Sequence, residues 1–227
     1  MHAETSVLVG PDRATAGPAS VVQGVYGSRG NLELIVPDAA DGLWVFWLNA
    51  DLPDDPPASA DVPPGSWSAG LRFAEGARYR EAVILQSAAG PDHLEVLALA
   101  ADGRLESWWW SPGPGFQRRG GEVATGVERV AAEHDAGALR VTVGEKGGER
   151  HLLSPADPYP ERTWHPTDAG PVLHDDGTAH RLLGDAGIDA DPGTARVAPS
   201  DRDGGALELT WRERGSLRHT GLPAASA

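Results

Sequence analysis

One pattern of residues occurs four times along this chain of 227 residues, and it constrains the fold more than any single residue does. Each copy holds an apolar run, a turn with Gly or Asp, a strand of alternating apolar and polar residues, a second turn ending in Gly, and a third strand. The alternating strands are anchored by Leu32–Leu34, Leu94–Val96, Leu139–Val141 and Leu207–Leu209. A unit of this size cannot bury both of its faces alone, so the copies must stack on one another. Radial stacking of such sheets predicts a β-propeller.

We therefore expect one all-β domain over residues 1–227, a β-propeller with four recognisable blades. The predicted repeats cover residues 19–75, 77–126, 127–184 and 194–223, preceded by a strand over residues 5–9. The last repeat contains only three strands. Pairing it with the N-terminal strand Thr5–Val9 would close the ring and remove two free sheet edges.

Two connections between the repeats leave room for alternatives. The segment Pro171–Gly184 is predicted to form a hairpin around Asp176–Gly177, because Asp-Gly favours tight turns. This hairpin either supplies the outer strand of the third unit or belongs to a degenerate fifth blade. The segment Asp51–Gly65 is rich in proline and aspartate, so we expect an exposed loop that is dispensable for folding. No segment shows the sustained spacing of an amphipathic helix of three turns.

Composition excludes several classes of function. The net charge of −14 argues against a surface for nucleic acid or anionic membrane, because phosphate binding needs clustered cations. The chain has no cysteine, which excludes disulfides and thiolate sites, and no apolar run long enough to span a bilayer. We expect no cofactor and no metal. A single lysine beside abundant arginine and alanine is typical of a GC-rich genome such as those of actinobacteria.

The location of the protein is not decided by the sequence. Its first ten residues, MHAETSVLVG, show neither the basic start nor the apolar core of a signal peptide. An extracellular location is the favoured interpretation, and it would require a signal that this chain no longer carries.

Two segments carry a resemblance to a known family. Gln23–Trp47 and Leu94–Trp110 resemble the blade repeat of lectin-type β-propellers of bacteria and fungi, the tachylectin-like repeats among them. That repeat reads roughly Gly-Asn-Leu-Glu-Val-Val, then Gly-Leu-x-His-x-Trp. The third and fourth copies lack the Trp that should follow His151 and His219. The resemblance implies a propeller that binds sugars in clefts between neighbouring blades.

Eight tryptophans are the sharpest functional signal, because an indole face can stack on a sugar ring and its N–H can bond a hydroxyl. We interpret Trp44, Trp67 and Trp211 as packing residues between blades. The run Trp108–Trp110 is different, because successive side chains of a strand point to opposite faces. All three indoles cannot be buried equally against one neighbour, so at least one should be partly exposed.

Three glutamates, Glu33, Glu95 and Glu208, occupy the same place in three of the repeats, whereas the third repeat has Arg140 there. One interpretation is a solvated or turn-capping carboxylate on the polar face of a strand. The other is an acceptor for sugar hydroxyls, repeated once per blade.

The predicted function is glycan binding between the first and second blades. We expect Trp47 and Trp109 to be stacking platforms, with Glu33, Glu95 and Asn31 as hydroxyl partners. The alternative is a protein–protein adaptor, or a structural subunit of a larger secreted assembly, so another protein subunit is a second possible partner. An enzyme is disfavoured, since no nucleophile elbow, phosphate loop or metal-ligand spacing is present and no catalytic residue stands out.

Overall fold

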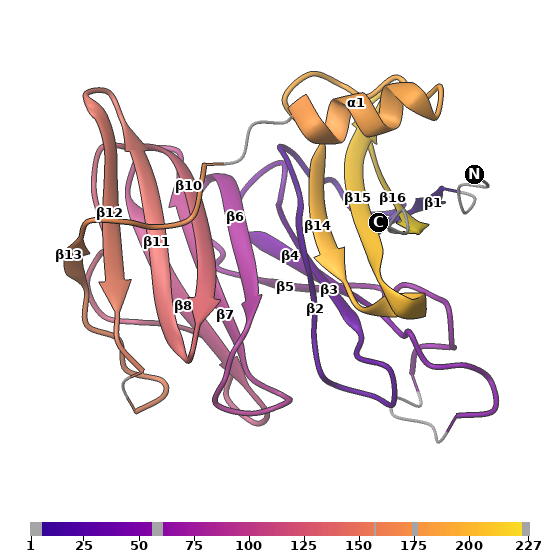
Figure 1. The fold of residues 1–227 in the computed structure, drawn as a ribbon, viewed down its shortest axis with the longest axis horizontal. Coiled ribbons are helices and arrows are strands. Elements are labelled where there is room, and N and C mark those ends of the chain that lie inside the picture. The colour runs from indigo at the N-terminus through magenta and orange to yellow at the C-terminus, as the bar shows by residue number, and fades with distance from the viewer. Residues whose placement is uncertain (1–5, 56–60, 157, 174–176, 224–227) are drawn as a thin grey trace.

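The structure is a computed structural model that describes residues 6–55, 61–156, 158–173 and 177–223. Within them the chain forms four antiparallel sheets of four strands each (Figure 1). Sheet 1 contains β2 (Ser20–Gln23), β3 (Leu32–Pro37), β4 (Leu43–Leu48) and β5 (Leu71–Phe73); sheet 2 contains β6 (Tyr79–Gln86), β7 (Leu94–Ala100), β8 (Leu105–Ser111) and β9 (Gly115–Arg118); sheet 3 contains β10 (Val127–Asp135), β11 (Ala138–Glu145), β12 (Gly148–Ser154) and β13 (His165–Thr167); sheet 4 contains β14 (Arg196–Ser200), β15 (Ala206–Glu213), β16 (Ser216–Pro223) and β1 (Val7–Leu8). A helix α1 (Gly177–Asp185) and a short 3₁₀ turn (Arg202–Gly204) precede β14 and β15 respectively.

Alternation along the second strand of each sheet decides which side chains meet across neighbouring sheets. In β3, Leu32, Leu34 and Val36 face sheet 4, whereas Ile35 faces sheet 2. The same strand therefore contributes to two cores, and its apolar residues are fully buried. The all-β fold class predicted from the repeats is confirmed, as is the arrangement in four blade-like sheets.

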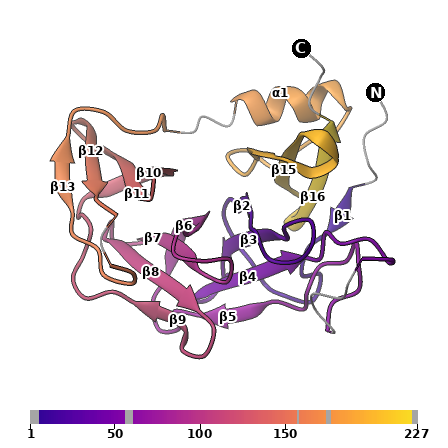
Figure 2. The same cartoon turned by 60° about the horizontal axis from the view of Figure 1, so that its bottom comes forward.

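The sheets follow one another in the order 3, 2, 1, 4 (Figure 2), and an apolar core joins each neighbouring pair. One core lies between sheets 1 and 2, a second between sheets 2 and 3, and a third between sheets 4 and 1. Among the described residues no apolar core joins sheet 3 to sheet 4. The outward face of sheet 3 is polar, with the Thr142 hydroxyl 2.9 Å from Nδ1 of His151. Within the described residues, sheet 3 therefore shares an apolar core with sheet 2 alone, and its other face is covered in part by Gly170 and Leu173 of the segment after β13.

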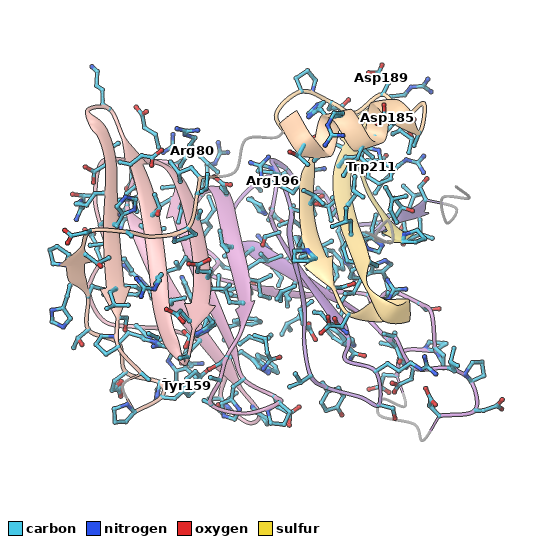
Figure 3. All side chains as sticks on the ribbon, viewed as in Figure 1. Arg80, Tyr159, Asp185, Asp189, Arg196 and Trp211 are labelled. Carbon is cyan, nitrogen blue, oxygen red and sulfur yellow. The ribbon has the colours of Figure 1, made fainter. Side chains whose placement is uncertain are left out.

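The free face of sheet 4 is apolar, and helix α1 covers it. Leu183 and Ala179 of the helix pack against Leu209 and Trp211 of β15. Figure 3 shows Trp211 beneath α1, where it is 1 % exposed. The hairpin predicted around Asp176–Gly177 is thus wrong for the described part of that segment, because residues from Gly177 onward form a helix; Asp176 lies outside the described residues. The helix replaces a neighbouring sheet as the cover for this face.

The outer strand of the third repeat does not come from the segment Pro171–Gly184. It is β13, which pairs with β12 through His151 opposite Thr167 and Leu153 opposite His165. The prediction that Pro171–Gly184 might supply this strand, or form part of a fifth blade, is therefore not met in the described residues. The described residues form the four sheets that were predicted, rather than the alternative of five.

The N-terminal strand pairs with the last strand of sheet 4 as predicted, whereas closure of the four sheets into a ring stays a prediction. Val7 pairs with His219 and Leu8 with Arg218, both antiparallel, and the amide of Val9 donates to the carbonyl of Leu217 at 3.0 Å. Val9 itself is buried in the core between sheets 4 and 1. Thr5, the first residue of the predicted strand, lies outside the described residues.

The proline-rich connection Asp51–Gly65 is more firmly attached than expected. Asp51 and Val62 are buried, and the Asn49 side-chain amide donates to the Val62 carbonyl at 2.8 Å. The amide of Gly65 donates to the Asn49 carbonyl at 2.7 Å. Both ends of the connection are therefore attached beside the end of β4, so the prediction of an exposed loop is wrong for these residues. That the loop is dispensable for folding stays a prediction. Residues 56–60 lie outside the described residues.

The first strands of the four sheets, β2, β6, β10 and β14, line a central cavity of about 780 Å³. Across it the guanidinium of Arg196 on β14 lies 3.3 Å from the carboxylate of Glu81 on β6. Within the described part of the chain, no helix is long and apolar enough to cross a membrane.

Candidate binding site

The repeated glutamates lie at the junctions between sheets. Glu33 shares the face of β3 that carries Ile35, and therefore points toward sheet 2. Glu95 shares the face of β7 that carries Leu97, and points toward sheet 3. Glu208 shares the face of β15 that carries Thr210, whose hydroxyl donates to the carbonyl of Ala19 beside sheet 1. Each acid thus faces the next sheet in the order, so the three junctions can be compared directly.

A pocket of about 520 Å³ opens at the junction of sheets 1 and 2. We call it the sheet 1–2 pocket. It receives residues from β3, β4, β5, β7, β8 and β9 and from four connecting segments. Its walls are formed by Tyr26, Asn31, Glu33, Val45, Trp47, Gly70, Leu71, Pro91, Asp92, Leu94, Trp110, Pro112 and Phe116.

Cross-strand pairing places the side chains of each wall side by side. On sheet 1, Glu33 is the direct partner of Trp47, so carboxyl and indole lie next to each other on one face. On sheet 2, Leu94 pairs with Trp110, which pairs with Phe116. Both indoles are half-buried, and their N–H groups make no hydrogen bond within the described residues. The pocket therefore offers stacking faces together with free donors.

A stack of aromatic rings fixes the floor between the two sheets. The rings of Phe73 and Phe116 are 3.9 Å apart and nearly parallel, at 8°. Trp108 meets Phe73 edge to face at 5.5 Å, and Trp110 lies 5.1 Å from Phe116. Because sheet 1 supplies Phe73 and sheet 2 the other three rings, the two walls are held at a set separation.

The turn between β2 and β3 forms the rim, and Asp51 holds it in place. The Oδ1 atom of Asp51 accepts hydrogen bonds from the backbone amides of Ser28 at 2.8 Å and Arg29 at 3.1 Å. Asn31 is buried at the end of this turn, and its Oδ1 accepts from the amide of Ala50 at 3.4 Å. Tyr26, at 39 % exposed, therefore sits on a turn tied to the rest of sheet 1.

The electrostatics of the pocket centre on Glu33. Burial raises the pKa of the Glu33 carboxyl from 4.5 to about 8, because the charged form loses solvation. Its carboxyl has no hydrogen bond or ion pair within the described residues, although the residue stays partly accessible from the pocket. Asp92 is the second acid of the lining, and none of the lining residues is Lys, Arg or His. An incompletely compensated acid in an aromatic pocket is a recognised mark of a binding site.

Glu95 lies in a closed junction instead. It is 1 % exposed, and Nη2 of Arg162 donates to its Oε1 at 2.8 Å, while Nη2 of Arg119 lies 2.7 Å from its Oε2. Trp109, its cross-strand partner, meets Tyr159 edge to face at 5.7 Å. Tyr159 lies at the end of the molecule away from α1 (Figure 3). The junction of sheets 2 and 3 is thus filled by the connection between β12 and β13.

Glu208 is equally enclosed at the junction of sheets 4 and 1. The Ser200 hydroxyl donates to its Oε1 at 2.6 Å, and Nε2 of His219 lies 2.9 Å from its Oε2. Burial raises the pKa of Glu208, but the hydrogen bonds from His219 and Ser200 and the charge of Arg202 more than offset it, so the pKa is lowered overall. The solvated-carboxylate interpretation is therefore wrong for both Glu95 and Glu208.

Three of the five predicted residues, Asn31, Glu33 and Trp47, line the sheet 1–2 pocket, and the other two do not. Glu95 and Trp109 face sheet 3, because both faces of sheet 2 abut a neighbour and odd-numbered residues of β7 and β8 point away from sheet 1. The missed wall residues are Trp110 and Phe116. Strand alternation already separates Trp109 from Trp110, but which face meets sheet 1 depends on packing.

Comparison with known proteins adds little. No protein-family model matches the chain, and no curated protein matches its sequence. The solved structures with a similar chain path include AofleA from Arthrobotrys oligospora, at 11 % identity and a TM-score of 0.48, and a triple Arg-to-Ala mutant of it, at 12 % and 0.49. They match 98 % of this chain, which spans 62 % and 58 % of their own lengths. Similarity at this level supports no conclusion about ligand or activity.

Proposed function

We propose that this protein binds carbohydrate in the sheet 1–2 pocket, without catalysis, on a scaffold in which the four sheets act as blades of a propeller type. The observation that carries the proposal is the combination of indole walls from two sheets with the Glu33 carboxyl between them, which has no partner among the described residues. Indole faces stack on the C–H faces of sugar rings, and the two indole N–H groups are available to hydroxyls. A pocket of about 520 Å³ falls in the range of about 300–1,000 Å³ usual for small-molecule sites.

The shape of the rim supports a ligand that extends beyond the pocket. Val25 is 58 % exposed, and Tyr26 and Leu71 are each 39 % exposed. Tyr26 and Leu71 belong to the pocket lining, so an apolar rim surrounds a polar centre. A terminal sugar of a longer glycan would fill the pocket while the next sugar lies on this rim. The same rim is where a protein partner would dock under the adaptor alternative.

The raised pKa of Glu33 also fits the general acid of a glycosidase, so catalysis requires a direct test. Glycoside hydrolysis needs a second carboxyl at a set separation from the first. In this pocket the second acid, Asp92, lies in the turn between β6 and β7 rather than on a strand. Groups on turns are held less rigidly than groups on strands, and for this reason we propose binding alone.

The test compares two equivalent tryptophans on a glycan array and by titration with a glycan that the array identifies. Trp47→Ala removes a pocket wall and should weaken binding by about 1–3 kcal/mol, roughly 10- to 100-fold, with little change in melting temperature. Trp109→Ala is the matched control at the corresponding position of sheet 2. It should lower the melting temperature and leave binding in place, because Trp109 packs on Tyr159.

Other outcomes decide between the functions. If no glycan binds the wild-type protein, the carbohydrate proposal fails and the adaptor alternative stands. If Trp109→Ala abolishes binding while Trp47→Ala does not, the binding site lies at the junction of sheets 2 and 3, and the proposed pocket is wrong. Hydrolysis of any chromogenic glycoside, lost in Glu33→Gln, would show an enzyme.

A further inference from the structure

The charge of the sheet 1–2 pocket differs from that of the two equivalent junctions. Its lining contains two carboxyl groups, from Glu33 and Asp92, and no basic side chain. The titratable groups that face Glu33 across the pocket are Asp92 from the turn preceding β7 and Tyr26 from the turn preceding β3. Neither can neutralise an ionised carboxylate. Any positive charge that meets Glu33 must come from outside the described chain.

The two closed junctions show what such a carboxylate accepts in this fold. Glu95 receives the guanidinium of Arg162 at 2.8 Å, with Arg119 at 2.7 Å. Glu208 receives the imidazole of His219 at 2.9 Å, with Arg202 at 3.2 Å. The carboxylates at both junctions are thus met by nitrogen donors.

An aromatic ring stands beside the donors in each closed junction. At the junction of sheets 2 and 3, Trp109 meets the ring of Tyr159 edge to face at 5.7 Å and 80°. At the junction of sheets 4 and 1, Trp67 meets the ring of His219 at 5.2 Å and 80°. The chain itself therefore fills these two junctions with a ring and a nitrogen donor. At the third junction the described lining supplies the acid and the aromatic rings, including Trp47 and Trp110, but no basic nitrogen donor beside Glu33.

The absence of a basic nitrogen donor beside Glu33 indicates what the ligand should supply. We propose that the sheet 1–2 pocket binds an amino sugar, whose free ammonium group pairs with Glu33 and whose ring lies against the indoles of Trp47 and Trp110. This inference rests on the carbohydrate-binding function proposed above and specifies its substrate class. An ammonium group close to aromatic faces gains a further attraction from the rings. An N-acetylated sugar is neutral at this nitrogen and lacks both interactions.

The whole molecule favours such a ligand as well. The chain carries a net charge of −14, which raises the local concentration of cationic sugars and speeds their association. Removal of water from the pocket strengthens the pairing of a single ammonium with Glu33, because its surroundings are apolar. Since burial raises the pKa of Glu33, an ammonium that makes it ionise would also release its proton to solvent.

The experiment is calorimetric titration at pH 7 with two matched trisaccharides, β-1,4-linked glucosamine and its fully N-acetylated form. The wild-type protein is compared with Glu33→Gln and with Glu145→Gln. The second substitution is the control, because it removes the same charge from the ion pair with Arg150 on sheet 3, outside the pocket. We expect the wild type and the control to bind the glucosamine trisaccharide at least tenfold more tightly than the acetylated one. Glu33→Gln should lose this preference.

A second readout separates pairing with Glu33 from general attraction to an acidic protein. Repeating the titration in buffers with different ionisation enthalpies measures the protons released on binding. We expect release of a substantial fraction of one proton from the wild type and the control, beyond any change in the free sugar, and a clear reduction of this release in Glu33→Gln.

The outcomes distinguish this inference from the proposed function. If the acetylated or another neutral glycan binds as tightly as the glucosamine trisaccharide, the amino-sugar inference is overturned while carbohydrate binding stands. If Glu33→Gln keeps the preference or the proton release, the inference is also overturned. If no sugar binds, but a simple cation such as tetramethylammonium does, both the proposed function and the inference fail.

Discussion

Glu33, Glu95 and Glu208 show how one residue type at one strand position reaches two different states. Glu95 and Glu208 are paired with Arg and His side chains, and their junctions are closed. Glu33 has no such partner in the part of the chain that the structure describes, and desolvation then dominates its titration. A buried acid without a partner costs stability, so its retention in an accessible pocket is more readily explained by a ligand than by folding.

The pKa of Glu33 makes stability depend on pH in a defined direction. Because burial raises the pKa from 4.5 to about 8, the folded protein keeps a proton between these values that the unfolded chain has lost. Stability should therefore fall as pH rises through this window, by at most about 1.4 kcal/mol per pH unit. Glu33→Gln should remove this pH dependence. The free energy of unfolding of the variant, measured in urea, should therefore exceed that of the wild type by an amount that grows from pH 5 to pH 8. A difference that stays constant with pH would contradict the assignment.

At the scale of single elements, the N-terminal strand has two parts with different roles. Val7 is 42 % exposed on the outer edge, whereas Val9 is 2 % exposed in the core between sheets 4 and 1. Removing residues 1–9 uncovers the edge of β16 and deletes the Val9 side chain, so we expect a loss of about 3 kcal/mol and a tendency to aggregate. Val9→Ala should cost about 1–3 kcal/mol in thermal or urea unfolding, and Val7→Ala less than about 0.5 kcal/mol. Equal effects would show that the strand pairing, not the core, matters.

The turn that carries Tyr26 depends on an acid from the proline-rich connection. Asp51→Ala should remove the acceptor of two backbone amides, lower stability by about 1–3 kcal/mol and weaken glycan binding, because the rim of the pocket loosens. Asp54→Ala is the control three residues away, where the exposed side chain makes no hydrogen bond within the described residues. It should change neither the melting temperature nor the titrated affinity. A loss of stability without a loss of affinity would separate this turn from the site.

At the scale of the whole molecule, the sheets differ in how many neighbours hold them. Sheets 1 and 2 each take part in two cores between sheets, whereas sheet 3 takes part in one. Strand β7 is buried along its whole length, while β13 is mostly exposed. Among the described residues, sheet 4 shares an apolar core with sheet 1, and α1 packs on its other face. Arrays that pack through nearest neighbours lose their end units first.

Hydrogen exchange of the backbone amides should follow this order. We expect the slowest exchange in β3 and β7 and faster exchange in β12, β13 and β1, with sheet 3 opening as a unit below the global unfolding free energy. Leu183→Ala removes apolar contacts between α1 and sheet 4. It should therefore speed amide exchange in β14 and β15 more than in β7. Equal protection in sheet 3 and β7 would show that sheet 3 is held by more than the core it shares with sheet 2.

The sequence by itself determined the repeating unit, because alternation and Asp-Gly turns are local properties of a few adjacent residues. It therefore predicted the sheets, the pairing of the N-terminal strand and the acids at equivalent positions. Helix α1 escaped prediction because it is short, and its few apolar residues are stable as a helix only against the apolar face of sheet 4. The side chains that pair with each acid also could not be predicted from the sequence. Arg162 and Tyr159 come from a connection more than sixty residues from Glu95, and only packing brings them into one junction and leaves the other open.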